Sequence, residues 1–193
     1  MSSDQFQRAV GAALRYHAGQ VRKGSSIPYF SHLLQVAGLV LEFGGDQDEA
    51  IAGLLHDAAE DAGGEATLAE IEAEFGPKVA GIVRENSDSI TESKEAKAPW
   101  RERKEKYIAA ISHKSESGCL VSICDKIHNA RSLLADQREQ GDRHWNRFNA
   151  TKLDSLWNYG QLARAFEGRA IEFPRLHRPA HELTRVVTDL AAA

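Results

Sequence analysis

The stretch from Leu54 to Asp61 constrains this chain more than any other part of its 193 residues. It reads Leu-Leu-His-Asp-Ala-Ala-Glu-Asp, so the adjacent pair His56 and Asp57 is followed within one helical turn by Glu60 and a final aspartate. Residues three and four apart share one face of an α-helix, so this spacing predicts a single helix with all four groups on one side. Like charges at that spacing destabilise a helix. We therefore expect a cation among them.

Helical spacing of apolar residues recurs along the whole chain, and strand patterns are nearly absent. The expected helices include residues 145–168 and 181–192, and a small hairpin is expected in the basic loop near residues 20–29. The sequence predicts an all-α fold of about eight to ten helices that pack irregularly rather than as a symmetric bundle. No repeat or linker interrupts the chain, so residues 1–193 are expected to form one domain.

The composition argues against several classes of partner. A formal net charge of −4 gives no reason to expect binding to nucleic acid or to a membrane surface. No apolar run approaches the roughly 20 residues that cross a bilayer, and the first residues do not resemble a signal peptide. Cys119 and Cys124 are not spaced as CxxC, so we interpret them as reduced packing residues. We expect a cytoplasmic protein.

Four residues of the types that bind metals lie on three helices that we expect to pack together: His32, His56, Asp57 and Asp125. Two imidazoles and two carboxylates without a thiolate argue against structural zinc and favour Mn²⁺, Fe²⁺ or another divalent ion. His32 alone could be a packing histidine, and Asp125 alone could be a carboxylate paired with Lys126. The acidic cluster around the His-Asp pair favours the metal site.

These residues belong to a wider set of motifs that resembles the HD-domain metallophosphohydrolases. The motifs are His17-Ala18-Gly19-Gln20 with Arg22-Lys23-Gly24, Pro28-Tyr29-Phe30-Ser31-His32, the stretch 54–61, and Asp125-Lys126-Ile127-His128-Asn129. Within that family the pattern is most similar to the hydrolase domain of RelA/SpoT proteins, and especially to stand-alone small alarmone hydrolases such as the metazoan SpoT homologues. Two departures are Leu33, where the family usually has proline, and Ser87-Asp88, where it usually has threonine and aspartate.

The resemblance implies an enzyme that removes the 3′-pyrophosphate from guanosine tetra- or pentaphosphate and releases GDP or GTP with pyrophosphate. It implies that Mn²⁺ or another divalent ion is bound by His32, His56, Asp57 and Asp125. It also implies that two acids outside the ligand set orient or deprotonate the attacking water and handle the leaving oxygen, namely Glu60 and Asp61. The residues expected to contact the nucleotide substrate are Arg22, Lys23, Ser87, Asp88, Lys126 and Asn129.

Two other interpretations stay open. A related HD-type phosphohydrolase would act on adenosine alarmones, on the 2′-phosphate of NADPH or on 5′-mononucleotides, because loops outside these motifs decide which base is bound. A catalytically silent HD protein would act only as a binding partner. Such degenerate copies normally lose a metal ligand or a carboxylate, whereas this sequence keeps the whole set.

Overall fold

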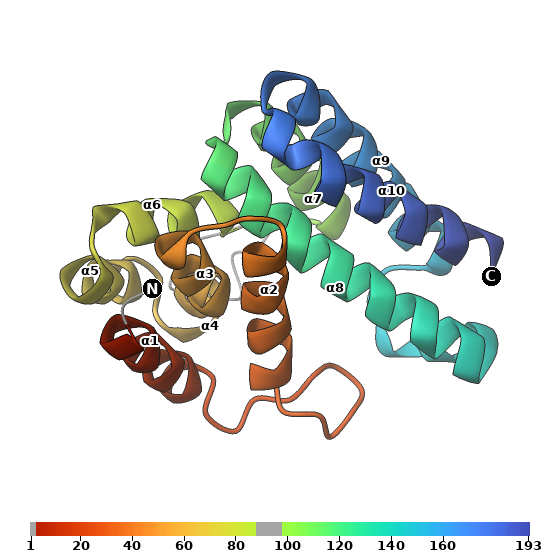
Figure 1. Ribbon diagram of the computed structural model, residues 1–193. Helices are drawn as coiled ribbons and strands as arrows, with labels where there is room; N and C mark the ends of the chain where they lie inside the picture. Colours follow the sequence, from red (N-terminus) through yellow and green to blue (C-terminus); the bar gives the residue numbers. More distant parts are fainter. Residues whose placement is uncertain (1–2, 88–97) are drawn as a thin grey trace.

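The computed structural model describes residues 3–87 and 98–193, and its fold is all-α, as predicted (Figure 1). The helices are α1 (Ser3–Tyr16), α2 (Phe30–Glu42), α3 (Gln47–Leu55), α4 (Ala58–Ala62), α5 (Gly64–Phe75), α6 (Pro77–Asn86), α7 (Trp100–Ala110), α8 (Glu116–Gln140), α9 (Lys152–Glu172) and α10 (His177–Ala192). Short 3₁₀ helices join the last four: η2 (Ile111–His113), η3 (Gly141–Arg147) and η4 (Pro174–Leu176). None of the helices in these residues is long and apolar enough to cross a membrane.

Helix α8 runs through the middle of the fold because most of its circumference can be buried. Residues 118–125 of this helix are buried without interruption, and a helix that is buried on every side belongs inside a core. It packs against α2, α3 and α6 toward one end of the molecule and against α9 and α10 toward the other (Figure 1). This position fixes the backbone of α8 against both halves of the fold.

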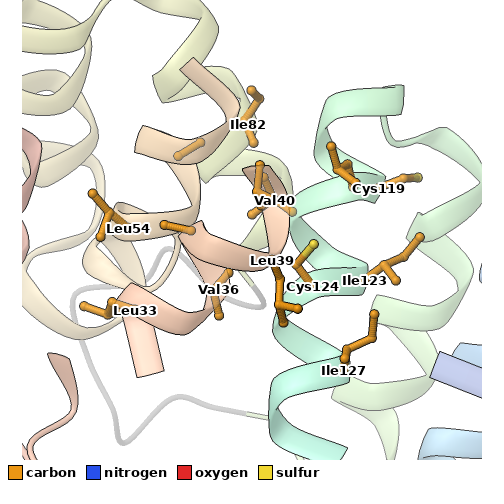
Figure 2. Close-up of a cluster of buried hydrophobic side chains, with 14 of the residues drawn as sticks. Leu33, Val36, Leu39, Val40, Leu54, Ile82, Cys119, Ile123, Cys124 and Ile127 are labelled. Atoms are coloured by element: carbon orange, nitrogen blue, oxygen red, sulfur yellow. The ribbon is translucent and has the colours of Figure 1, made fainter. Parts of the chain in front are cut away.

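A cluster of apolar side chains fills the space between α2 and α8. Figure 2 shows Val40 of α2, Leu54 of α3 and Ile82 of α6 gathered opposite Cys124 and Ile127 of α8. Both cysteines of the chain are buried free thiols in this region. Because interiors are packed as tightly as organic crystals, these contacts hold the helices that carry His32 and Asp125 in one arrangement.

The structure corrects the expectation of one continuous helix through residues 54–61. Helix α3 ends at Leu55, α4 begins at Ala58, and His56 and Asp57 form the turn between them. The backbone of Asp57 has φ −95° and ψ −6°, away from the ideal helical values. Its carboxylate accepts a hydrogen bond from the hydroxyl of Tyr29, which is distant in sequence. Apolar spacing reports local helix formation and contains no signal for this contact.

Two further helix boundaries differ from the expected ones. Instead of one helix over residues 145–168, η3 ends at Arg147 and α9 begins at Lys152. Thr151 caps α9 because its hydroxyl accepts the N–H of Asp154 at 3.1 Å. Helix α10 begins at His177 rather than near residue 181, because Pro179 falls in its first turn, where the missing N–H of proline costs no hydrogen bond.

The segment between α1 and α2 holds the basic loop. Where a hairpin is expected, the only β pairing in the described part of the chain is one antiparallel bridge between Val21 and Pro28. The N–H of Arg22 donates to the carbonyl of Ile27 at 2.8 Å. Gly24 has φ +74°, and a Cβ at this position would lie 2.5 Å from the Arg147 side chain. Only glycine fits so closely against η3 in this conformation.

Glu49 joins three parts of the fold through a buried carboxylate. It is 1% exposed and forms a reciprocal capping box with Asp46 at the start of α3. Ser117 of α8 donates to it at 2.6 Å, and Arg175 of η4 donates at 2.7 and 3.0 Å. Burial opposes ionisation, but the Arg175 and Ser117 hydrogen bonds hold the pKa of Glu49 below its ordinary value.

We predict that Glu49→Ala lowers the free energy of unfolding by about 2–3 kcal/mol, because the Arg175 guanidinium then keeps, among the described residues, only its 3.4 Å ion pair with Glu116. Arg175 is 31% exposed, which places the loss at the low end for a buried pair. A carboxyl group whose pKa is depressed by folding stabilises at neutral pH and loses that contribution as the pH falls through its folded pKa. The gap between variant and wild type should therefore narrow in acid, measured by urea unfolding. Glu139→Ala, at an exposed position of α8, is the matched control, and an equal loss there would contradict the prediction.

Candidate metal centre

Four side chains converge from α2, the turn between α3 and α4, and α8. The Nε2 atom of His56 lies 3.1 Å from Oδ2 of Asp57 and 3.7 Å from Oδ1 of Asp125. The Nε2 atom of His32 lies 3.3 Å from Oδ1 of Asp125 and 3.8 Å from Oδ2 of Asp57. The ligand atoms of His32, His56 and Asp57 all lie within 4.8 Å of one another. Asp125 joins this group through its two contacts with the imidazole nitrogens, so side chains from three parts of the chain meet at one centre.

A contact at Nδ1 orients each of the two imidazole rings, so that Nε2 of His32 and Nε2 of His56 face the centre. Nδ1 of His56 lies 2.9 Å from the carbonyl of Gly53, so Nδ1 carries a hydrogen and Nε2 is the nitrogen that faces the centre. Nδ1 of His32 lies 2.7 Å from Nδ1 of His128. Burial, with His32 and Arg22 nearby, lowers the pKa of His128 to about 3 and keeps that ring neutral. Metal-binding histidines are typically oriented through their second nitrogen in this way.

Hydrogen bonds from neighbouring side chains also hold the two aspartates, and they reach the same oxygens, Oδ2 of Asp57 and Oδ1 of Asp125, that face the imidazoles. Asp57 accepts the hydroxyl of Tyr29. Asp125 accepts the ammonium of Lys126 on Oδ2 at 2.6 Å and the amide of Asn129 on Oδ1. Tyr29 therefore does more than pack against its neighbours, because its hydroxyl holds the carboxylate of Asp57.

The electrostatics of the centre suit a cation. Both Nε2 atoms are buried without a hydrogen-bond partner among the described residues, and an unpaired buried polar atom costs about 1–3 kcal/mol. Burial lowers the pKa of His32. Burial also opposes a proton on His56, but Asp57 and Asp125 raise the pKa of that ring well above its ordinary value. The negative potential that attracts a proton to His56 would also attract a divalent cation, so these residues fit a metal ion.

A cavity of about 450 Å³ opens beside the centre. Asp57 and Asp125 line it together with Glu60 and Asp61 of α4. A second cavity, of about 470 Å³, is lined by Arg22 of the basic loop. The two adjoin because several residues line both: Lys23, Tyr29, Asn129, Leu133, Phe148 and Tyr159. The acid pair and the basic loop therefore line adjoining cavities, which we refer to together as the cleft.

The wall of the cleft formed by α7 is positively charged around the buried side chain of Tyr107. The ammonium groups of Lys114, Lys126 and Lys104 lie 4.3, 4.8 and 5.9 Å from its ring centre. Lys114 is 4% exposed and donates to the Tyr107 hydroxyl at 3.1 Å and to Asn86 at 3.2 Å. Burial alone would raise the pKa of Tyr107, but Lys126 and Lys114 lower it below its ordinary value.

The remaining predicted substrate contacts fall in different places. Arg22 donates to Asn129 at 2.8 Å, and Lys23 donates to Asn149 at 3.4 Å, so both basic side chains are held at the cleft. Ser87 instead donates its hydroxyl to the carbonyl of Val83, within its own helical turn, at 3.1 Å. Asp88 lies outside the described residues.

Two groups of supporting residues were not identified from the sequence. His128 follows Asp125 by three residues on α8, so helical spacing alone could have placed its ring beside the metal ligands. Tyr107 and Lys114 offered no such signal, because they sit in a charged helix and after a 3₁₀ turn. Their proximity depends on the turn that the chain makes through η2 after α7.

Comparison with known proteins places this geometry in a family. The HD domain family matches residues 9–152. The chain is 38% identical over 138 residues to the guanosine-3′,5′-bis(diphosphate) 3′-pyrophosphohydrolase MESH1 of Xenopus tropicalis, covering 69% of this chain and 73% of that protein. Human MESH1 is 35% identical over 132 residues, covering 67% and 69%. A GTP pyrophosphokinase of Streptomyces coelicolor is 33% identical over 142 residues, which are 72% of this chain and only 16% of that protein.

Two solved structures share the fold. A metazoan ortholog of SpoT that hydrolyses ppGpp has a TM-score of 0.72 at 23% identity, covering 98% of this chain and 95% of that one. The lmo0812 protein of Listeria monocytogenes has a TM-score of 0.67 at 28% identity, covering 81% and 96%. The family match and the identity to the MESH1 proteins show that the chain belongs to the HD domain family and, within it, to the group that includes MESH1.

Proposed function

We propose that this chain is a metal-dependent hydrolase that removes the 3′-pyrophosphate from guanosine tetra- or pentaphosphate. The observation that carries the proposal is the convergence of two unpaired imidazole nitrogens and two carboxylates beside a cleft with acids and cations on its walls. The names of the MESH1 relatives support the substrate class.

HD domains are metal-dependent hydrolase folds, and the cluster of His32, His56 and Asp57 fits a divalent ion, with Asp125 beside both imidazoles as the fourth proposed ligand. Nitrogen and oxygen donors without thiolates favour Mn²⁺ or a similar ion over structural zinc. When bound, the ion supplies Lewis-acid chemistry to the reacting phosphate and the attacking water. Tyr29, Lys126 and His128 hold the donor atoms in place.

Glu60 and Asp61 are positioned to handle the protons of the reaction. Water adds to the phosphorus that is bonded to the ribose 3′-oxygen, and the bond between that phosphorus and that oxygen breaks. The attacking water must lose a proton, and the leaving 3′-oxygen must gain one. Both carboxylates line the cleft beside Asp57. A base and an acid from this pair would supply the two transfers.

The cations of the cleft would hold the phosphates. Arg22 and Lys23 present positive charge from the basic loop, and Lys126 presents it beside Asp125. These local charges offset the net charge of −4, which alone would repel a polyphosphate. Asn129, whose amide bridges Arg22 and Asp125, lines both cavities, where it would contact a ribose or phosphate oxygen.

A direct test compares substrates on the purified chain with Mn²⁺. We expect turnover of guanosine tetra- and pentaphosphate, with pyrophosphate and GDP or GTP as products on ion-exchange chromatography. Adenosine 3′-pyrophosphates, NADPH and 5′-mononucleotides serve as the other arms. Turnover of 5′-monophosphates with no action on any 3′-pyrophosphate would contradict the proposal.

Asp57→Ala should abolish turnover and weaken Mn²⁺ binding by at least about 100-fold, because it removes a ligand atom rather than a supporting group. Isothermal titration calorimetry measures the affinity. A ligand at 100 times its Kd stabilises a fold by about 2.7 kcal/mol, so Mn²⁺ should raise the Tm of the wild type and not of this variant. Asp189→Ala, in an exposed ion pair on α10, should behave as wild type. Unchanged Mn²⁺ affinity in Asp57→Ala would refute the ligand assignment.

Glu60→Gln should keep the Mn²⁺-induced rise in Tm but lower kcat by about 100-fold or more, because the amide cannot accept a proton at neutral pH. Steady-state kinetics and thermal melts separate the two effects. Glu65→Gln on α5, whose carboxylate pairs with Arg84, is the control. A wild-type kcat in Glu60→Gln would show that this side chain handles no proton.

A further inference from the structure

The His17-Ala18-Gly19-Gln20 motif has no part in the function proposed above, yet the structure connects it to the acid pair. Helix α1 ends at Tyr16, and Gly19 adopts φ +73°, a left-handed conformation that favours glycine. The N–H of Gln20 then donates back to the carbonyl of His17 at 3.1 Å. This turn brings the two side chains together, with Nδ1 of His17 2.7 Å from Oε1 of Gln20.

The side chain of Gln20 continues to Asp61 of α4. Its amide nitrogen donates to Oδ2 of Asp61 at 2.9 Å. An ionised carboxylate can only accept, so the amide nitrogen must face Asp61 and the amide oxygen must face His17. Nδ1 of His17 must then carry its hydrogen. The three side chains form a chain of donors that runs in one direction and ends on the carboxylate.

The burial of His17 indicates what this histidine contributes. Its side chain is fully buried, and its Nε2 has no hydrogen-bond partner among the described residues. An unpaired buried nitrogen lowers stability, so an apolar ring would serve packing better at this position. The group that an apolar ring lacks is the N–H at Nδ1, which holds the Gln20 amide.

The backbone of Gln20 makes a second connection to the centre. Its carbonyl accepts the N–H of Tyr29 at 2.9 Å, and the hydroxyl of Tyr29 donates to Asp57. Gln20 therefore joins one of the proposed catalytic acids to the support of a proposed metal ligand.

We propose that Gln20 is a positioning residue that fixes the orientation of Asp61, and that His17 fixes the Gln20 amide. This inference rests on the proposed function and deepens it. The Asp61 side chain is 32% exposed, so the packing around it leaves room for rotation. The amide of Gln20 donates to Oδ2 of Asp61. Among the described residues Oδ1 of Asp61 has no hydrogen bond, so Oδ1 is the oxygen that can accept or donate a proton in the reaction. Holding a catalytic group in a reactive orientation raises kcat rather than substrate affinity.

The test is a double-mutant cycle of Gln20→Ala and Asp61→Asn, with kcat and KM measured in Mn²⁺. In the wild-type background Gln20→Ala should lower kcat about tenfold and leave KM within about twofold. In the Asp61→Asn background the same change should lower kcat by less than about twofold, because the carboxylate it positions is absent. Equal losses in both backgrounds would overturn the inference. Tyr16→Phe removes a bond from the same end of α1 to Glu70 and should keep the wild-type kcat.

A second pair of variants tests His17 and decides the outcome if Asp61→Asn has no measurable turnover. His17→Asn keeps an N–H close to the position of Nδ1, whereas His17→Ala does not, and both remove the ring. The asparagine variant should retain a several-fold higher kcat, and equal kcat values would overturn the inference. Failure of the proposed function is a distinct result, because in that case the wild type itself does not hydrolyse guanosine 3′-pyrophosphates. The same variants then test Gln20 on whichever nucleotide the wild type turns over.

Discussion

The site depends on two buried imidazole nitrogens that face two carboxylates, and neither nitrogen has a hydrogen-bond partner among the described residues. His32 and His56 come from different helices, and each ring is turned by a bond at Nδ1 so that Nε2 points to the shared centre. Stability alone would not favour this arrangement, because unpaired buried nitrogens and adjacent carboxylates both raise the energy of the fold. A divalent cation at this centre would relieve both costs together. The apolar core between α2 and α8 fixes the relative positions of the helices that carry His32 and Asp125 (Figure 2).

Around this centre the chain separates charge by position. The carboxylates of Glu60 and Asp61 on α4 line one part of the cleft. The basic loop and the lysines around Tyr107 supply positive charge from other parts of its wall. Lys114 is buried with only neutral partners among the described residues, Asn86 and Tyr107. A protein with a net charge of −4 can in this way create a locally positive potential in the cleft that attracts a polyphosphate. Ionisable groups whose pKa values are shifted by burial and by neighbouring charges concentrate at functional sites.

The sequence was sufficient for the fold class and for the set of residues that meet at the centre. Helical periodicity reports which faces are buried, and the His-Asp pair with Glu60 and Asp61 marks a cluster that a surface helix does not need. The break between α3 and α4 was not predictable in the same way, because it accompanies the contact of Asp57 with Tyr29 across 28 positions. The links from Gln20 to Asp61 and from Lys114 to Tyr107 also depend on tertiary packing. Sequence spacing defines neighbours within one helix, whereas these pairs lie on different elements.

The most direct test of the metal centre is an anomalous difference map from a crystal grown with Mn²⁺. One strong peak should lie between Nε2 of His32 and Nε2 of His56, within coordination distance of Asp57 and Asp125. A peak at another group of acids, or none at this centre with the four side chains placed as here, would contradict the account.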